Sequence, residues 1–269
     1  MVDPREDQAA GLRRLFRRAP PTVVALYATG RSRASTALLA AHRIAGQSRP
    51  VLLLDEAAGD ASLARALGLP DGPDLLGVLG SEIGVREVLQ PVPGLVGRVP
   101  VSAAALALPL LDEERRARLV ASLRELNRHA GFVLIHAGAG TADDPSPFVC
   151  AAPRRLIVAG ASRSGATEAY RVIKQLAAAG AGSLHVAVAN ARSRDEAHDF
   201  FAALGHLVRR HVGVPLAWLG EAERDDLAAG LENDAVEASS GDAAAAFLRR
   251  LAAFGQPAAR GAINSGVRP

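Results

Sequence analysis

The chain has 269 residues, of which 49% are hydrophobic and only 4% aromatic, so an aliphatic core in one α/β domain, or in two small ones, is expected. The formal net charge of +3 comes almost entirely from scattered arginines with no aromatic residues between them for stacking bases, which argues against nucleic-acid binding. A single cysteine excludes an internal disulfide, and the charged N-terminus and short apolar runs predict no signal peptide or membrane span; we expect a cytoplasmic protein.

Residues 3–18 are predicted to form an amphipathic helix with acidic residues at its start and arginines at its end, as the helix dipole favours. Pro20 and Pro21 then separate this helix from the rest of the chain, so residues 1–21 form an N-terminal unit. The helix either folds back on the core or docks on a partner. Gly11 lowers its helix propensity by about 1 kcal/mol, which favours docking because a purely structural helix has no need of it.

Residues 22–56 have the layout of an opening βαβ unit: an apolar strand, a short loop of small and charged residues, a helical pattern, and a second strand that ends at Asp55. In P-loop proteins such a loop binds phosphate through backbone N–H groups and a lysine. The only lysine in this chain is Lys174, far downstream. Either Arg31 or Arg33 takes the place of the lysine, or the site is vestigial.

Further apolar segments alternate with helical patterns along the rest of the chain. This alternation predicts a doubly wound, mostly parallel α/β sheet flanked by helices, within one domain of residues 22–254, with sites at the carboxyl ends of the strands. His136 lies at one strand end without partners at metal-ligand spacing, so we interpret it as a polar core residue. The expected strands are residues 95–101, 132–136, 155–159, 184–190 and 214–219, and the main helices are residues 112–129, 166–179 and 193–211.

A last helix is predicted at residues 242–254, and residues 255–269 are expected to be a disordered tail. The helix has arginines on one side and four apolar side chains on the other, which suits either a packed terminal helix or one that binds a membrane surface. The apolar residues are Phe247, Leu248, Leu251 and Phe254. The second alternative would place the protein at the inner face of a membrane.

Several segments, in order, resemble the MinD/ParA family, and within it the FlhG/FleN group of flagellar-number regulators. The most specific segment, residues 7–13, reads DQAAGLR and matches the N-terminal DQAxxLR helix of that group; others are residues 51–55, 134–140, 168–174, 188–193 and 219–226. The resemblance implies a MinD-like P-loop NTPase fold with an extra N-terminal helix that binds and stimulates the partner GTPase FlhF. The implied partner-binding residues are Asp7, Gln8, Leu12, Arg13 and Leu15.

The departures from the family concern its nucleotide site. The family loop GKGGVGKT corresponds to residues 29–36, TGRSRAST, where both lysines and most glycines are lost. The Asp-Ala-Asp of the family becomes Asp55-Glu56-Ala57, and the aspartate of a later strand becomes His136. We therefore predict a weak or inactive ATPase, with no catalytic residue and no metal-ligand set, although ATP or ADP with Mg²⁺ is left open. The residues equivalent to the family's nucleotide site are Gly30, Arg31, Ser32, Arg33, Ser35, Thr36, Asp55 and Asn190.

Three hypotheses follow. The first is a FlhG/FleN-like regulator of flagellar number or placement that acts on an FlhF-like GTPase, with basal-body components as further candidate partners. The second is an active MinD/ParA-type ATPase that forms an ATP-dependent homodimer and binds membrane, with Arg31 or Arg33 replacing lysine. The third, ParA-like DNA binding, rests on the arginine excess alone and ranks last.

Overall fold

The computed structural model describes residues 20–46, 49–80, 82–138, 145–181, 184–232 and 243–254. The predicted N-terminal helix, with the partner-binding residues that the family resemblance implies, and the predicted tail, residues 255–269, lie outside these described residues. Within the described part of the chain, no helix is both long and apolar enough to cross a membrane.

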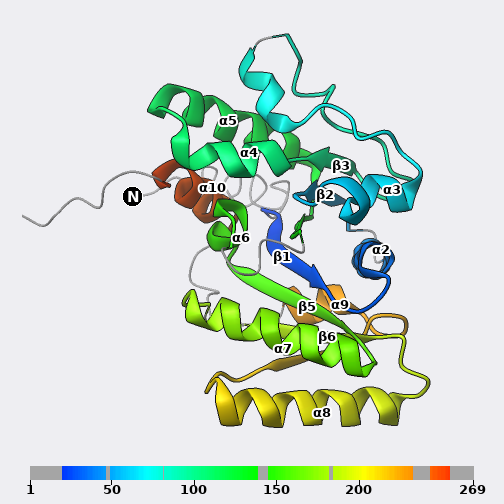
Figure 1. The fold of residues 1–269 in the computed structure, drawn as a ribbon. Helices are drawn as coiled ribbons and strands as arrows, with labels where there is room; N and C mark the ends of the chain where they lie inside the picture. The colour runs from blue at the N-terminus through cyan, green and yellow to red at the C-terminus, as the bar shows by residue number, and fades with distance from the viewer. Residues whose placement is uncertain are drawn as a thin grey trace, which may run out of the picture.

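The described residues contain a seven-stranded sheet in which every pairing is parallel, in the order β3-β2-β4-β1-β5-β6-β7 (Figure 1). Five strands, β1, β2, β4, β5 and β6, are mostly buried and largely apolar, as is typical of a parallel sheet covered on both faces. This sheet confirms the predicted doubly wound α/β class. The strands are β1 Thr22–Ala28, β2 Val51–Asp55, β3 Gly97–Pro100, β4 Phe132–His136, β5 Arg154–Gly160, β6 Leu184–Ala189 and β7 Ala217–Glu221.

The helices cover both faces, because successive residues of each strand point to opposite sides. Val24 and Leu26 of β1 belong to the apolar cluster beneath α2, α3 and α9, whereas Val23 and Ala25 belong to the larger cluster beneath α5, α7, α8 and α10. The helices are α2 Arg33–Ala45, α3 Leu63–Leu67, α4 Ser102–Ala107, α5 Glu113–Leu126, α6 Pro147–Ala151, α7 Arg163–Ala178, α8 Arg194–His211, α9 Leu227–Glu232 and α10 Ala243–Ala253.

Helix α10 packs into the core against α5 and α6 (Figure 1). Phe247 and Leu251 are fully buried, Leu248 is nearly so, and the Phe247 ring lies 6.4 Å from that of Phe148. Of the two alternatives for this segment, the structure shows the packed terminal helix, since burial of these side chains is what stabilises α10. Phe254 is partly buried against the same cluster, so these side chains form no exposed apolar face.

Candidate functional site

The loop that follows β1 is shorter than the sequence suggests. Helix α2 begins at Arg33, so only residues 29–32 separate it from the strand, and Ser35 and Thr36 lie in its first turn. Gly30 has φ +98°, a conformation that glycine adopts without strain, and the buried Thr29 hydroxyl donates a 3.1 Å hydrogen bond to the Gly165 carbonyl. No side chain caps α2 and its first turn holds no acidic residue, so its N–H groups form a positive helix end.

An open groove of about 780 Å³ lies at this helix end, at the carboxyl edge of β1, β5 and β6. Loops that are distant in the sequence form it together, and its lining includes two arginines, Arg31 and Arg163, but no carboxylate. Asn190, with φ 60°, closes one side and donates its backbone N–H to Glu223. The lining residues are Thr29, Gly30, Arg31, Ser32, Ser35, Thr36, Leu39, Gly160, Ala161, Ser162, Arg163, Ser164 and Asn190. Six of the eight sequence-predicted nucleotide residues therefore meet here, and their role as ligands stays a prediction.

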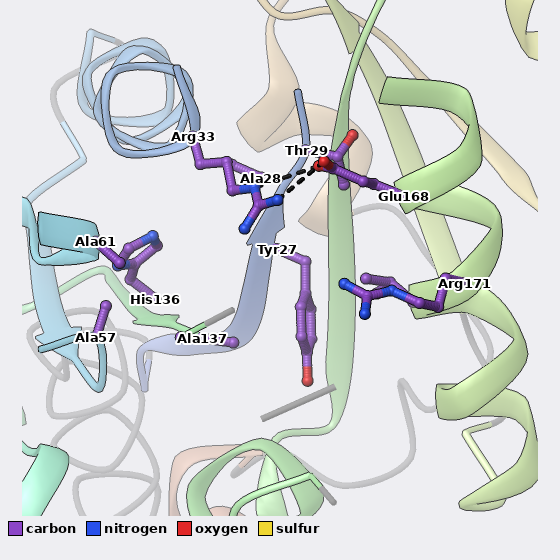
Figure 2. A pocket seen from close by; sticks show the side chains of 12 residues that line it. Tyr27, Ala28, Thr29, Arg33, Ala57, Ala61, His136, Ala137, Glu168 and Arg171 are labelled. Carbon is purple, nitrogen blue, oxygen red and sulfur yellow. Dashed lines mark hydrogen bonds and ion pairs between the residues drawn. The ribbon is translucent and has the colours of Figure 1, made fainter. Parts of the chain in front are cut away.

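Arg33 does not line this groove, because Glu168 of α7 holds its guanidinium (Figure 2). The Glu168 carboxylate accepts hydrogen bonds from Arg33 Nη2 at 2.9 Å and Nε at 3.2 Å, and from the Gly30 N–H at 2.9 Å. Partial burial raises the pKa of Glu168, but the hydrogen bonds from Arg33 and Gly30 and the charges of Arg33 and Arg171 outweigh this and lower it overall. A second hollow lies beside the groove (Figure 2), and its lining includes Arg33, Glu168, Arg171, Tyr27 and His136.

Asp55, the other predicted site residue outside the groove, is fully buried at the end of β2. Its carboxylate accepts hydrogen bonds from Arg98 Nε at 2.7 Å, from the Ser62 hydroxyl at 2.9 Å and from the Leu63 N–H at 2.9 Å, and it lies 2.9 Å from His136 Nδ1. Burial raises the pKa of Asp55, but the hydrogen bonds and charges of His136 and Arg98 lower it overall. The side chain thus joins β2, β3 and β4, and His136 is a polar core residue.

Arg98 was missed as a partner of Asp55 by sequence reasoning. Its side chain is almost fully buried and also donates to the Ser62 hydroxyl at 2.7 Å and to the Asp71 carbonyl at 3.1 Å. An arginine inside a predicted strand was the available signal, because a buried cation requires a buried anion nearby. The sequence alone does not show which acid this is.

Glu56, the next residue along the chain, is also buried, and its backbone N–H donates a 3.0 Å hydrogen bond to the His136 carbonyl. Burial raises its pKa to about 7, although the hydrogen bond that it accepts from the Ser146 hydroxyl lowers it. Among the described residues, no group of three or more His, Cys, Asp or Glu side chains is placed to hold a metal ion.

No family model matches the chain. The chain is 28% identical to the antiactivator FleN of Pseudomonas aeruginosa over 184 residues, which is 68% of this chain and 66%, just under two thirds, of FleN. This homology confirms the resemblance to the FlhG/FleN group found in the sequence. A cobyrinic acid a,c-diamide synthase structure from Mycobacterium smegmatis superposes with a TM-score of 0.50 at 18% identity, and the match covers 79% of this chain and 91% of the synthase. A MinC:MinD complex from Aquifex aeolicus superposes with a TM-score of 0.49 at 18% identity, and the match covers 86% of this chain and 93% of the matched chain. At 18% identity the synthase superposition bears on the fold alone.

Proposed function

We propose that this homologue of FleN, with its MinD/ParA-type P-loop fold, is a regulator of flagellar number or placement that works by contact with a partner and not by turning over ATP. Residues 22–254 serve as the scaffold, and residues 1–21 bind and stimulate an FlhF-like GTPase. The observation that carries the proposal is the state of the phosphate loop: it has no lysine, and Arg33, the first residue of α2, is engaged by Glu168.

The length of the loop supports the loss of turnover. A functional P-loop needs four residues between its two glycines and a lysine directly after the second, so that several N–H groups and an ammonium surround the phosphates. Here residues 29–32 complete the whole connection from β1 to α2. Phosphoryl transfer relies almost entirely on positioning and on stabilisation of charge, and Arg31 alone is a poor substitute for a complete cradle.

The acidic residues that the family uses in hydrolysis also support the loss of ATP turnover. A carboxylate that assists hydrolysis must reach a metal ion or the attacking water. The carboxylate oxygens of Asp55 instead accept hydrogen bonds from Arg98, from Ser62 and from a backbone N–H within the core. The next position that the family fills with aspartate is Ala57, and His136 is bonded to Asp55. These substitutions leave a fold in which the former site contributes to stability.

A second function, nucleotide binding without turnover, is favoured by the groove itself. Arg31 and Arg163 supply positive charge, Ser162 and Ser164 supply hydroxyls, and Asn190 supplies a side-chain amide. Asn190 also resembles the asparagine with which the family contacts adenine. A groove with this lining suits a phosphate-bearing ligand. In this role ATP or ADP would be a bound effector that alters contacts with a partner or with a second copy of the chain.

The test is stimulation of GTP hydrolysis by an FlhF-like GTPase, with the full chain added in the absence of ATP. The double variant Gln8→Ala/Leu12→Ala should lose the stimulation, while Arg17→Ala, in the same segment but outside the motif, should retain it. Circular dichroism and the melting temperature should be the same for all three proteins. Undiminished stimulation by the double variant would remove the N-terminal helix from the mechanism, and ATP turnover by the wild type would favour the ATPase hypothesis.

A further inference from the structure

The carboxylate of Glu168 occupies donors that a bound phosphate would need. The Gly30 N–H belongs to the loop after β1, and Arg33 belongs to the first turn of α2, at the positive end of that helix. Backbone N–H groups beside a helix N-terminus, together with a guanidinium, are the usual donors to phosphate oxygens. Glu168 comes from α7, about 135 residues away in the sequence, so this contact is made only by the tertiary fold.

We propose that Glu168 is a built-in competitor for phosphate: its carboxylate closes the anion site at the end of β1, and a phosphate-bearing ligand binds there only when this carboxylate is displaced or neutralised. The inference rests on the proposed function, because it concerns how access of a phosphate-bearing ligand to the degenerate nucleotide site of a contact-based regulator is controlled. Control of phosphate binding then depends on one side chain, that of Glu168.

Charge in the two adjoining hollows supports this role. Glu168 is the only acidic residue that lines either of them in the described part of the chain, whereas Arg31, Arg33, Arg163 and Arg171 all do so. Removing Glu168 would release Arg33 and leave Arg171, on the next turn of α7, unopposed in the same hollow (Figure 2). The region would change from a partly neutralised surface to one with a uniform positive potential, which attracts polyanions.

The exposure of the ion pair makes displacement feasible. The Arg33 and Glu168 side chains are 40% and 27% exposed, so water screens their attraction and the pair adds little to the stability of the fold. A di- or triphosphate carries more charge than one carboxylate and can accept from both Arg33 and Gly30. If the ion pair served only to hold α2 against α7, its exposure would have no bearing on ligand binding. The experiment must therefore separate this structural role from competition with phosphate.

Isothermal titration calorimetry of the full chain with ADP, ATP and inorganic pyrophosphate, each with Mg²⁺, separates them. Glu168→Ala should bind at least one of these ligands about tenfold or more tightly than the wild type does, since like-charge repulsion is removed and two donors are released. Adding Arg33→Ala to Glu168→Ala should abolish the gain. Glu168→Gln, which keeps an acceptor for the Gly30 N–H but loses the charge, should show an intermediate gain and keeps the test valid if the alanine variant fails to fold.

The matched control is Glu232→Ala, because Glu232 is also paired with a partly exposed arginine, Arg49, which precedes β2 and so lies at the opposite edge of the parallel sheet from the groove. It should leave all affinities unchanged. Equal affinity of the wild type and both Glu168 variants would overturn the inference, as would a gain that persists without Arg33. A gain for pyrophosphate alone would identify a simple anion site, and a larger gain for ADP would identify a nucleotide site. None of these outcomes depends on GTPase stimulation, so failure here and failure of the proposed function are distinguishable.

Discussion

Replacing Asp55 by alanine should destabilise the fold strongly. The Asp55 side chain is fully buried, and its loss leaves the almost fully buried Arg98 guanidinium without its counter-ion. It also leaves the Ser62 hydroxyl and the Leu63 N–H without this acceptor. Breaking a buried ion pair by removing one partner costs about 3 to 5 kcal/mol, because a charge remains buried without compensation. We therefore expect the free energy of unfolding to fall by about this amount, a large fraction of the total for a domain of this size.

Urea denaturation followed by circular dichroism at pH 7 measures this loss. Asp60→Ala is the matched control: Asp60 is paired with Arg65 on the surface, and that substitution should change the free energy of unfolding by less than about 1 kcal/mol. The double variant Asp55→Ala/Arg98→Met should be more stable than the sum of the two single losses predicts, since both charges are then absent.

The dependence on pH gives a second check. The pKa of Asp55 is lower in the folded protein than its ordinary value, so the ionised carboxylate stabilises the fold above about pH 4 and this contribution disappears as the pH falls further. The wild type should lose stability on acidification below about pH 4 more steeply than Asp55→Ala does. A loss below about 1 kcal/mol at pH 7, with parallel acid profiles, would refute the view of Asp55 as a structural anchor and return it to the ligand site.

Three further predictions concern other buried positions. Because burial raises the pKa of Glu56 to about 7, the contribution of this residue to stability falls as the pH rises from about 4.5 to 7. In urea titrations, Glu56→Gln should therefore raise the free energy of unfolding at pH 8 by up to about 3 kcal/mol and have little effect at pH 5. Gly165→Ala should cost about 1 to 3 kcal/mol in the same assay, since the new Cβ would lie 2.1 Å from the Gly160 carbonyl oxygen, and a neutral result would mean that the loop between β5 and α7 is pliable. Phe247→Ala should lower the unfolding free energy by about 3 to 5 kcal/mol, whereas an unchanged melting temperature together with binding to anionic vesicles would revive the membrane role of α10.

The fold class was predictable from the sequence because it depends on local patterns. Runs such as residues 51–55 and 132–136 are too short and too uniformly apolar for surface helices, and helical patterns alternate with them. The start of α2 at Arg33 was not evident from the sequence, because the polar residues of its first turn resemble loop residues. With α2 beginning at Arg33, residues 29–32 alone connect it to β1.

The family-derived site was predictable only in part. The motif comparison assigned Gly30, Arg31 and Asn190 to one site, and all three line one groove, since these positions follow ends of strands that are close together in the sheet. Their role as ligands stays a prediction. It could not show that Asp55 would be withdrawn into the core or that Glu168 would reach Arg33. Both results depend on which side chains meet across elements far apart in the chain.

The sequence by itself determined the parallel sheet and the absence of a lysine from the phosphate loop, because hydrophobic periodicity and residue identity are properties of the chain alone. Only the tertiary structure decided what the remaining charged groups do. Arg98 is held by Asp55 and Arg33 by Glu168, because a charge in a folded protein takes the partner that packing brings within reach. Such partners are chosen by distance in space, which the order of residues does not reveal.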